Sequence, residues 1–215
     1  MPTTKYYNEA GKRLQSFSTK AKNIGWGHYN LMRWANAQGL EGNSLDEAKA
    51  TVTMPGTIAH LLVECDLKGT KADLSRYDQE DIEKAHVSYS NYILWKQQWK
   101  IKPIFVEEPM VSERFQYGGC PDLFAHCTLG NGLFDWKTGR RYASIFVQLA
   151  AYGNLIEEVK GFNVNGGFHC LRIPKDEDVP GFHHDWWETL PDEAWEAWEC
   201  AVRLGEIEKK LNGLL

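Results

Sequence analysis

The chain has 215 residues, of which 43% are hydrophobic and 25% are charged. These proportions are those of an ordinary soluble globular protein with one sizeable core. The net charge of −5 argues against a protein that binds nucleic acid non-specifically over its whole surface. It is compatible with an enzyme that binds DNA through a local basic patch. No apolar run reaches ~18 residues, so we expect no membrane span.

The N-terminus and the cysteines indicate a cytoplasmic protein. Met1 to Ala10 is polar and lacks the apolar core of a secretion signal. The five cysteines are scattered and odd in number, which favours reduced thiols in a cytosol. We expect disorder at Met1 to Asn8 and at Lys175 to Gly181.

The first hundred residues are predicted to be helical. Hydrophobic spacing predicts helices over Gly25 to Ala37, Met54 to Leu67 and Asp78 to Lys100. Pro55 is interpreted as the opening residue of the second helix. Ser44, followed at the third position by Glu47, resembles a helix cap. In the third helix four aromatic residues lie at helical spacing, Tyr89, Tyr92, Trp95 and Trp99, and Trp95 and Trp99 are interpreted as a core seam.

The pattern changes after Pro103 to short β-rich runs broken by Gly and Pro. Strands are predicted at Ile104 to Val111, Arg114 to Tyr117, Asp122 to Leu129 and Leu133 to Lys137. Gly130-Asn131-Gly132 predicts a tight hairpin turn before the last of these. A helix at Tyr142 to Lys160, a strand at Gly167 to Ile173 and a helix at Pro191 to Leu211 complete the order. His183-His184-Asp185 is interpreted as a surface loop.

This order predicts an α/β core behind a helical N-terminal region. We expect one domain over residues 1–215. Within it, residues 1–102 are mainly helical, residues 103–175 carry the sheet and the helix that follows it, and residues 176–215 carry the C-terminal helix.

Asp122 and Asp135-Trp136-Lys137 are the centre of the candidate site. Asp135 and Lys137 lie two apart on a strand and therefore share one face, with Trp136 buried on the other. Carboxylates are the ligands that hard divalent cations prefer, and a neighbouring lysine can hold water or neutralise phosphate charge. Asp122 reaches Asp135 only if the strand register allows it. The alternative is an exposed charge patch across two strands.

Further candidates lie upstream and downstream of this motif. His60 and Glu64 share one helix face, and an imidazole can ligate a metal or contact a phosphate; the alternative is a capping or partly buried histidine. Strand alternation lets only one of two adjacent glutamates face the site, and we assign Glu107, with Glu108 outward. Downstream, four residues are candidates for contact with Lys137 or with DNA phosphates: Arg140, Arg141, Gln148 and Tyr152. Their alternatives are a solvated turn and a tyrosine packed below the sheet.

Nine tryptophans are many for this length, and most are interpreted as core. Trp26, in a basic region, is the candidate for stacking on an unpaired base.

Five motifs occur in one order: Gly56-Thr57-Ile58-Ala59-His60, Glu107, Gly119-Cys120-Pro121-Asp122, Asp135-Trp136-Lys137-Thr138-Gly139 and Gln148-Leu149-Ala150-Ala151-Tyr152. Together they resemble the RecB-like branch of the PD-(D/E)xK nuclease superfamily, including small phage-type exonucleases. The resemblance implies a restriction-endonuclease-like core, a central mixed β-sheet flanked by helices. It implies that the metal is held by His60, Asp122, Asp135 and the Trp136 carbonyl.

The resemblance also implies roles for the other residues. Lys137 would be the catalytic lysine and Glu107 the first acidic motif. Gln148 and Tyr152 would support the site and contact DNA, and Glu64 matches a frequent acidic position. Some relatives hold an iron–sulfur cluster, but no cysteine precedes His60 and Cys170 and Cys200 stand far apart, so we expect no cluster.

The implied function is a Mg²⁺- or Mn²⁺-dependent DNA exonuclease with one or two ions. It would hydrolyse linear single- or double-stranded DNA, leave 5′-phosphates and serve phage or bacterial recombination, repair or genome processing, with a single-strand-annealing or replication protein as a candidate partner. If phage-encoded, it would act in the host cytoplasm. The alternatives are a single-strand or structure-specific endonuclease and a non-catalytic DNA-binding module. Polarity, strand preference, processivity and oligomeric state stay open.

Overall fold

A computed structural model describes residues 4–137, 142–172 and 183–214, apart from the side chains of residues 49–52. Its centre is a five-stranded mixed sheet of order β3-β6-β7-β8-β9. The pair β7–β8 is parallel and the other neighbours are antiparallel. The strands are β3 (Lys102–Val106), β6 (Leu123–Cys127), β7 (Gly130–Lys137), β8 (Gly167–Arg172) and β9 (His183–Trp187). The predicted fold class, a central mixed sheet flanked by helices, is confirmed.

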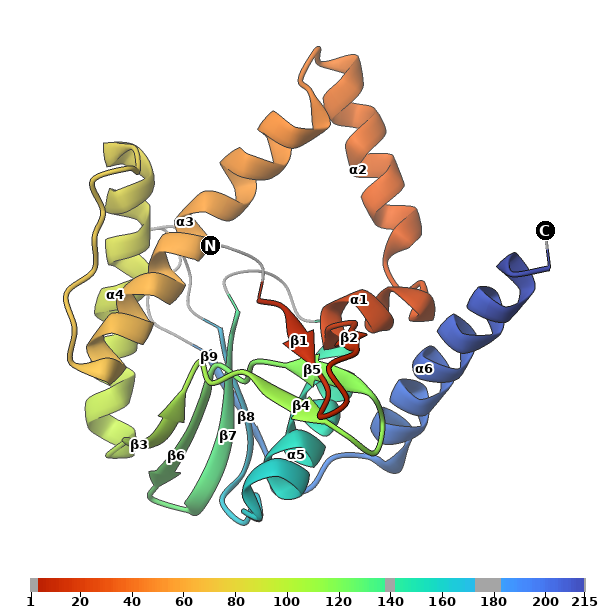
Figure 1. Ribbon diagram of the computed structural model, residues 1–215. Helices are drawn as coiled ribbons and strands as arrows, with labels where there is room; N and C mark the ends of the chain where they lie inside the picture. Colours follow the sequence, from red (N-terminus) through yellow and green to blue (C-terminus); the bar gives the residue numbers. More distant parts are fainter. Residues whose placement is uncertain (1–3, 138–141, 173–182, 215) are drawn as a thin grey trace.

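Helices cover both faces of the sheet (Figure 1). On one face lie α3 (Leu45–Lys68) and α4 (Gln79–Trp99), and on the other lies α5 (Ser144–Lys160), backed by α6 (Asp192–Asn212). Alternation along β7 sends Phe134 and Trp136 into the α3–α4 side and Leu133 toward α5. Trp136 is buried edge-on against Tyr92 and Trp95, so the predicted aromatic seam of α4 is confirmed.

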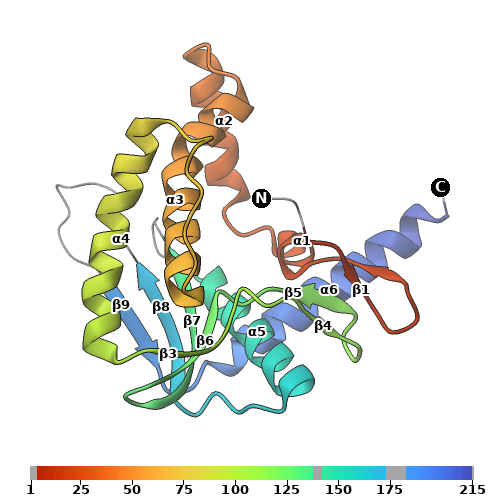
Figure 2. The ribbon, with the colours of Figure 1, turned by 60° about the vertical axis from the view of Figure 1, so that its left-hand side comes forward.

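The N-terminal segment packs against residues 110–119 and against α6 before the chain turns away from the sheet. A hairpin of β1 (Tyr6–Tyr7) and β2 (Arg13–Leu14) precedes α1 (Phe17–Ala21), a 3-10 turn η1 (Lys22–Ile24) and α2 (His28–Leu40). In Figures 1 and 2, α2 and the start of α3 project away from the sheet and meet at their far ends. No residue of α2 is buried.

Tyr6 explains why the expected disorder at Met1 to Asn8 is wrong for the described part of that segment. Its ring lies on the small hairpin of β4 (Met110–Ser112) and β5 (Tyr117–Gly119), directly over Gly118. A Cβ on Gly118 would sit 2.0 Å from Tyr6 Cγ, so glycine is required for this contact. The Lys175 to Gly181 prediction lies outside the described residues.

The helix predicted from Met54 is in fact the second half of one long helix. The capping box between Ser44 and Glu47 is present and starts α3 at Leu45, so Pro55 lies inside the helix. A proline removes one backbone donor from a helix. Here the cap and the packed residues on either side of Pro55, including buried Ile58, keep the helix continuous. The other predicted helices form within a few residues of their expected bounds.

Three strand predictions were wrong in detail. The run Ile104 to Val111 is split between β3 and β4, because Glu107 takes a positive φ of 47° before Pro109. Arg114 to Gln116 form the turn that leads into β5 rather than a strand. Cys127 pairs with Gly130, so the β6–β7 turn is at Thr128 and Leu129 instead of Gly130 to Gly132. Those glycines let β8 and its preceding loop approach, since a Cβ on Gly132 would sit 2.8 Å from His169 Nε2.

His183-His184-Asp185 begins strand β9 and does not form a surface loop. Its residues pair antiparallel with β8, with His184 opposite Leu171 and Asp185 opposite Cys170. The sheet therefore extends past residue 175. In the described part of the chain no helix is long and apolar enough to cross a membrane.

Candidate active site

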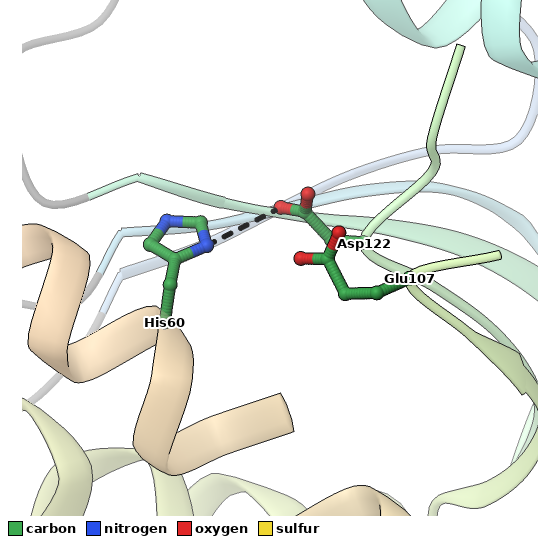
Figure 3. Close-up of side chains that lie close together, drawn as sticks. All are labelled: His60, Glu107 and Asp122. Atoms are coloured by element: carbon green, nitrogen blue, oxygen red, sulfur yellow. Dashed lines mark ion pairs between the residues drawn. The ribbon is translucent and has the colours of Figure 1, made fainter. Parts of the chain in front are cut away.

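Three potential metal ligands converge at one edge of the sheet. Glu107 follows the end of β3, Asp122 precedes the start of β6, and His60 reaches them from α3 (Figure 3). One ligand atom from each lies within 4.8 Å of the others. His60 Nδ1 is 4.0 Å from Asp122 Oδ2. A single cation could therefore contact all three.

Backbone contacts fix Asp122 at this edge. Leu123 pairs with Phe134, which sets Asp122 beside Asp135 on the neighbouring strand. Asp122 Oδ2 accepts a hydrogen bond from the Trp136 N–H at 2.9 Å. The Asp122 carbonyl accepts one from the Glu107 N–H at 3.2 Å. The register on which the sequence interpretation depended is the one that brings the two aspartates together.

Glu107 and Glu108 point to different places, as predicted, but the cause is not strand alternation, because both follow the end of β3 and Glu107 has a positive φ of 47°. Glu108 forms an ion pair with Lys160 on α5, away from the cluster. Glu107 accepts a hydrogen bond from the Cys120 thiol at 3.4 Å. Burial, and then the negative charge of Asp122, raise the pKa of Glu107 to about 8. The site therefore holds several carboxylates close together, and a divalent cation would neutralise their negative charge.

A second group, centred on Asp135, lies beside the first. Asp135 is 1% exposed and its Oδ2 lies 2.5 Å from Lys137 Nζ. Gln148 on α5 links the two residues: its Nε2 donates to Asp135 Oδ1 at 2.7 Å, and its Oε1 accepts from Lys137 Nζ at 3.2 Å. The predicted contact between Gln148 and the lysine is therefore present.

The charges of this second group favour a cationic lysine. Burial lowers the pKa of Lys137, but the carboxylates of Asp135 and Asp122 outweigh burial and raise it. Burial raises the pKa of Asp135, against the opposing effect of Lys137. A lysine held in its charged form can stabilise negative charge on a phosphate but is a poor proton acceptor.

The described residues fit a hard divalent cation. The ligand set of two carboxylates and one imidazole is one that Mg²⁺ and Mn²⁺ accept. Asp135 Oδ2 is buried and pairs with Lys137 Nζ at 2.5 Å. The donor set that fits the ion is therefore the three clustered side chains, whose carboxylates carry charge that a cation would neutralise. His60, Glu107 and Asp122 would hold this ion, with Asp135 beside it.

The remaining predicted site residues belong neither to the metal-ligand cluster nor to the group around Asp135, or lack an outcome. Tyr152 is buried edge-on against Phe17, which matches the alternative of a tyrosine packed below the sheet. Glu64 pairs with Lys68 at 2.7 Å on the same helix. The metal role of the Trp136 carbonyl stays a prediction. Arg140 and Arg141 lie outside the described residues.

Trp26 is half-exposed and lines cavities at the base of α2. The larger cavity, about 770 Å³, also contains Trp34 and the N-terminal residue of α5, Ser144. This placement suits a stacking residue, which stays a prediction for Trp26.

Sequence reasoning missed two residues near the site. Cys120 donates to Glu107, and its place beside Asp122 was noted only as part of a motif. Arg172 is the register partner of Lys137 on the parallel strand β8, so both side chains lie on the α5 face. A positive residue two positions after buried Cys170 was the available signal for Arg172.

A histidine pair on the other face was also missed. Trp95 Nε1 donates to His184 Nδ1 at 3.1 Å, His184 Nε2 lies 2.9 Å from His169 Nδ1, and His169 Nε2 lies 3.0 Å from the Gly166 carbonyl. This chain of contacts is satisfied only when both rings are neutral, with protons on Nε2. Burial lowers the pKa of His169 to about 3 and that of His184 to about 4.

Comparison with known proteins gives structural likenesses but no match in sequence. No family model matches the chain, and no curated protein matches it. A crystal structure from Eubacterium rectale named "Putative exonuclease" is similar over 75% of this chain and 69% of that chain, with a TM-score of 0.46 and 13% identity.

Proposed function

We propose that this chain is a divalent-metal-dependent deoxyribonuclease, and that it digests linear DNA from an end. The observation that carries the proposal is the convergence of His60, Glu107 and Asp122 beside the Asp135–Lys137 pair. These residues come from four separate segments of the chain. An exposed surface charge patch needs no such convergence, no buried aspartate and no glutamine that bridges the aspartate to the lysine.

The bound ion would polarise the scissile phosphate and stabilise the leaving oxygen. Lys137, held cationic by Asp135 and Asp122, would hold the attacking water and neutralise charge that develops on the phosphate. Gln148 would keep Lys137 and Asp135 in this arrangement through its two hydrogen bonds. The product would carry a 5′-phosphate.

The proposal is tested with wild-type protein, Asp135→Ala and Lys137→Ala on end-labelled linear DNA, with Mg²⁺ or with EDTA. Lys209→Ala, an exposed lysine of α6, is the matched control. We expect wild type and Lys209→Ala to degrade DNA only with Mg²⁺. The two site variants, shown to be folded by circular dichroism, should lose at least about a hundredfold in rate. If both site variants cleaved DNA as fast as wild type, the assignment of the active site would be wrong.

The substrate separates an exonuclease from the other candidate functions. Linear duplex, linear single strands and closed circles are compared under the same conditions. Digestion of linear DNA with intact circles supports the exonuclease. Cleavage of closed single-stranded circles would instead establish an endonuclease, and DNA binding without Mg²⁺-dependent cleavage would establish a binding module.

A further inference from the structure

A cavity of about 400 Å³ lies next to Lys137 on the α5 face of the sheet. Its polar lining comes from Lys137, Arg172, Asp185 and Ser144, and its apolar walls include Tyr142 and Trp187. The volume is within the range of pockets that hold small organic ligands. Neither the metal-ligand cluster nor the Asp135–Gln148 contact uses this space.

Arg172 lines this cavity and has one side-chain nitrogen without a hydrogen bond to the described residues. Its Nε is buried and has no hydrogen-bond partner among the described residues. Its nearest charged partner, Asp185 Oδ2, is 3.6 Å away, which is too long for a hydrogen bond. A buried guanidinium nitrogen without an acceptor is costly, and a phosphate oxygen would satisfy it.

Charge changes sign along this edge of the sheet. Glu107, Asp122 and Asp135 stand at β3, β6 and β7, whereas Lys137 and Arg172 close the parallel strands β7 and β8. Lys137 and Arg172 are register partners on adjacent strands, so their backbones are ~4.8 Å apart and both side chains leave the same face. A DNA strand crossing the edge would meet the acidic group and its metal at one phosphate and the cations at the next.

The start of α5 adds to the positive potential of the cavity. This helix of 17 residues begins at Ser144, and its N-cap residue, Ala143, has no side-chain capping bond. The N-terminal end of a helix carries partial positive charge. Tyr142, 61% exposed at the rim, offers a face on which a base can stack.

From these observations we infer that the cavity binds the nucleotide next to the scissile bond, with Arg172 on its phosphate and Tyr142 against its base. This inference rests on the proposed function, because it places the nucleotide beside the metal site. Arg172 is a binding residue that sets where the strand lies, and it takes no part in the chemistry.

The test measures binding of tetrathymidylate in EDTA, where no hydrolysis occurs, by isothermal titration calorimetry. Arg172→Gln should weaken binding on the order of tenfold or more, and the slope of log affinity against log salt should fall by about one. Arg203→Gln, an exposed arginine of α6, is the matched control and should bind as wild type does. With Mg²⁺, Arg172→Gln should raise the KM for the oligonucleotide and leave kcat within about threefold.

Ala143→Trp covers the case in which Arg172→Gln does not fold. Ala143 is exposed at the rim of the cavity, so the indole fills the space without disturbing the core. It should weaken binding as Arg172→Gln does. Wild-type affinity in the folded variants, or no binding by wild type, would overturn the inference. If wild type binds the oligonucleotide, both variants lose this binding and wild type never cleaves DNA, the cavity is a nucleotide-binding site but the proposed function fails.

Discussion

Two regions of this protein, one around His60 and one around His169 and His184, differ in how their polar atoms are satisfied. His60 is partly exposed beside two carboxylates, and the group is electrostatically crowded. His169 and His184 sit on the α4 face, where each ring nitrogen has a partner and both rings are neutral. A histidine whose nitrogens are all engaged within the fold serves packing, whereas one that faces unneutralised carboxylates is prepared for a ligand.

The largest difference expected between the two regions is in the direction of their pH dependence. For the histidine pair, the folded pKa values of about 3 and about 4 lie below the ordinary 6.5. Their contribution to stability is complete above pH 6.5 and is lost as pH falls through 4, on the order of a few kcal/mol. The free energy of unfolding, measured by urea denaturation from pH 4 to 7, should therefore fall less steeply at acid pH in His169→Gln than in wild type. It should also destabilise the protein at pH 7 by about 1–3 kcal/mol, since Trp95 and His184 lose a complete network.

Glu107 should show the opposite behaviour in metal-free protein. Its folded pKa of about 8 lies above the ordinary 4.5, so its carboxyl favours folding at low pH and this contribution is lost as pH rises from 4.5 through 8. Glu107→Gln should therefore flatten the decline in stability between pH 6.5 and 8 in EDTA. An alkaline decline unchanged by this substitution would show that Glu107 is not electrostatically strained.

Within the charged region, Gln148 is expected to orient catalytic groups without binding the metal. It holds Asp135 and Lys137 together but touches no potential metal ligand of the first cluster. Gln148→Ala should lower kcat about 10- to 100-fold, as expected for a residue that orients catalytic groups. KM should change little. A larger effect on KM than on kcat in steady-state DNA hydrolysis would assign Gln148 to substrate binding instead.

The smallest effect is expected at Glu64. Its carboxylate pairs with Lys68 one helical turn away, and such pairs contribute ~0.3–0.5 kcal/mol. Glu64→Gln should shift the free energy of unfolding by no more than that and should leave Mn²⁺ affinity near the wild-type value. A tenfold loss of Mn²⁺ affinity would bring Glu64 into the metal site.

Local patterns predicted most of the secondary structure and the members of the charged group. The cap at Ser44, the seam of α4 and the D-x-K strand depend on neighbours in sequence, and they form as expected. The predicted proximity of Asp122 and Asp135 needed only the register of one hairpin.

The errors have a common physical cause, because tertiary contacts overrule local preference. Gly130 and Gly132 were interpreted as a turn, yet they are glycines because the β8 segment packs against them. His184 was assigned to a loop because no local pattern reveals that Trp95, 89 positions away, donates to it. Arg172 was missed because its relation to Lys137 exists only through the parallel pairing of β7 with β8.

The central claim is that His60, Glu107 and Asp122 hold a catalytic divalent ion. Asp122→Asn tests it most directly, because the amide oxygen keeps an acceptor for the Trp136 N–H while the ligand charge is removed. Calorimetric titration with Mn²⁺ and hydrolysis of linear DNA are measured on the same preparations. We predict that wild type binds Mn²⁺ and cleaves, and that Asp122→Asn, folded, does neither. Equal Mn²⁺ binding by the two proteins would contradict the account.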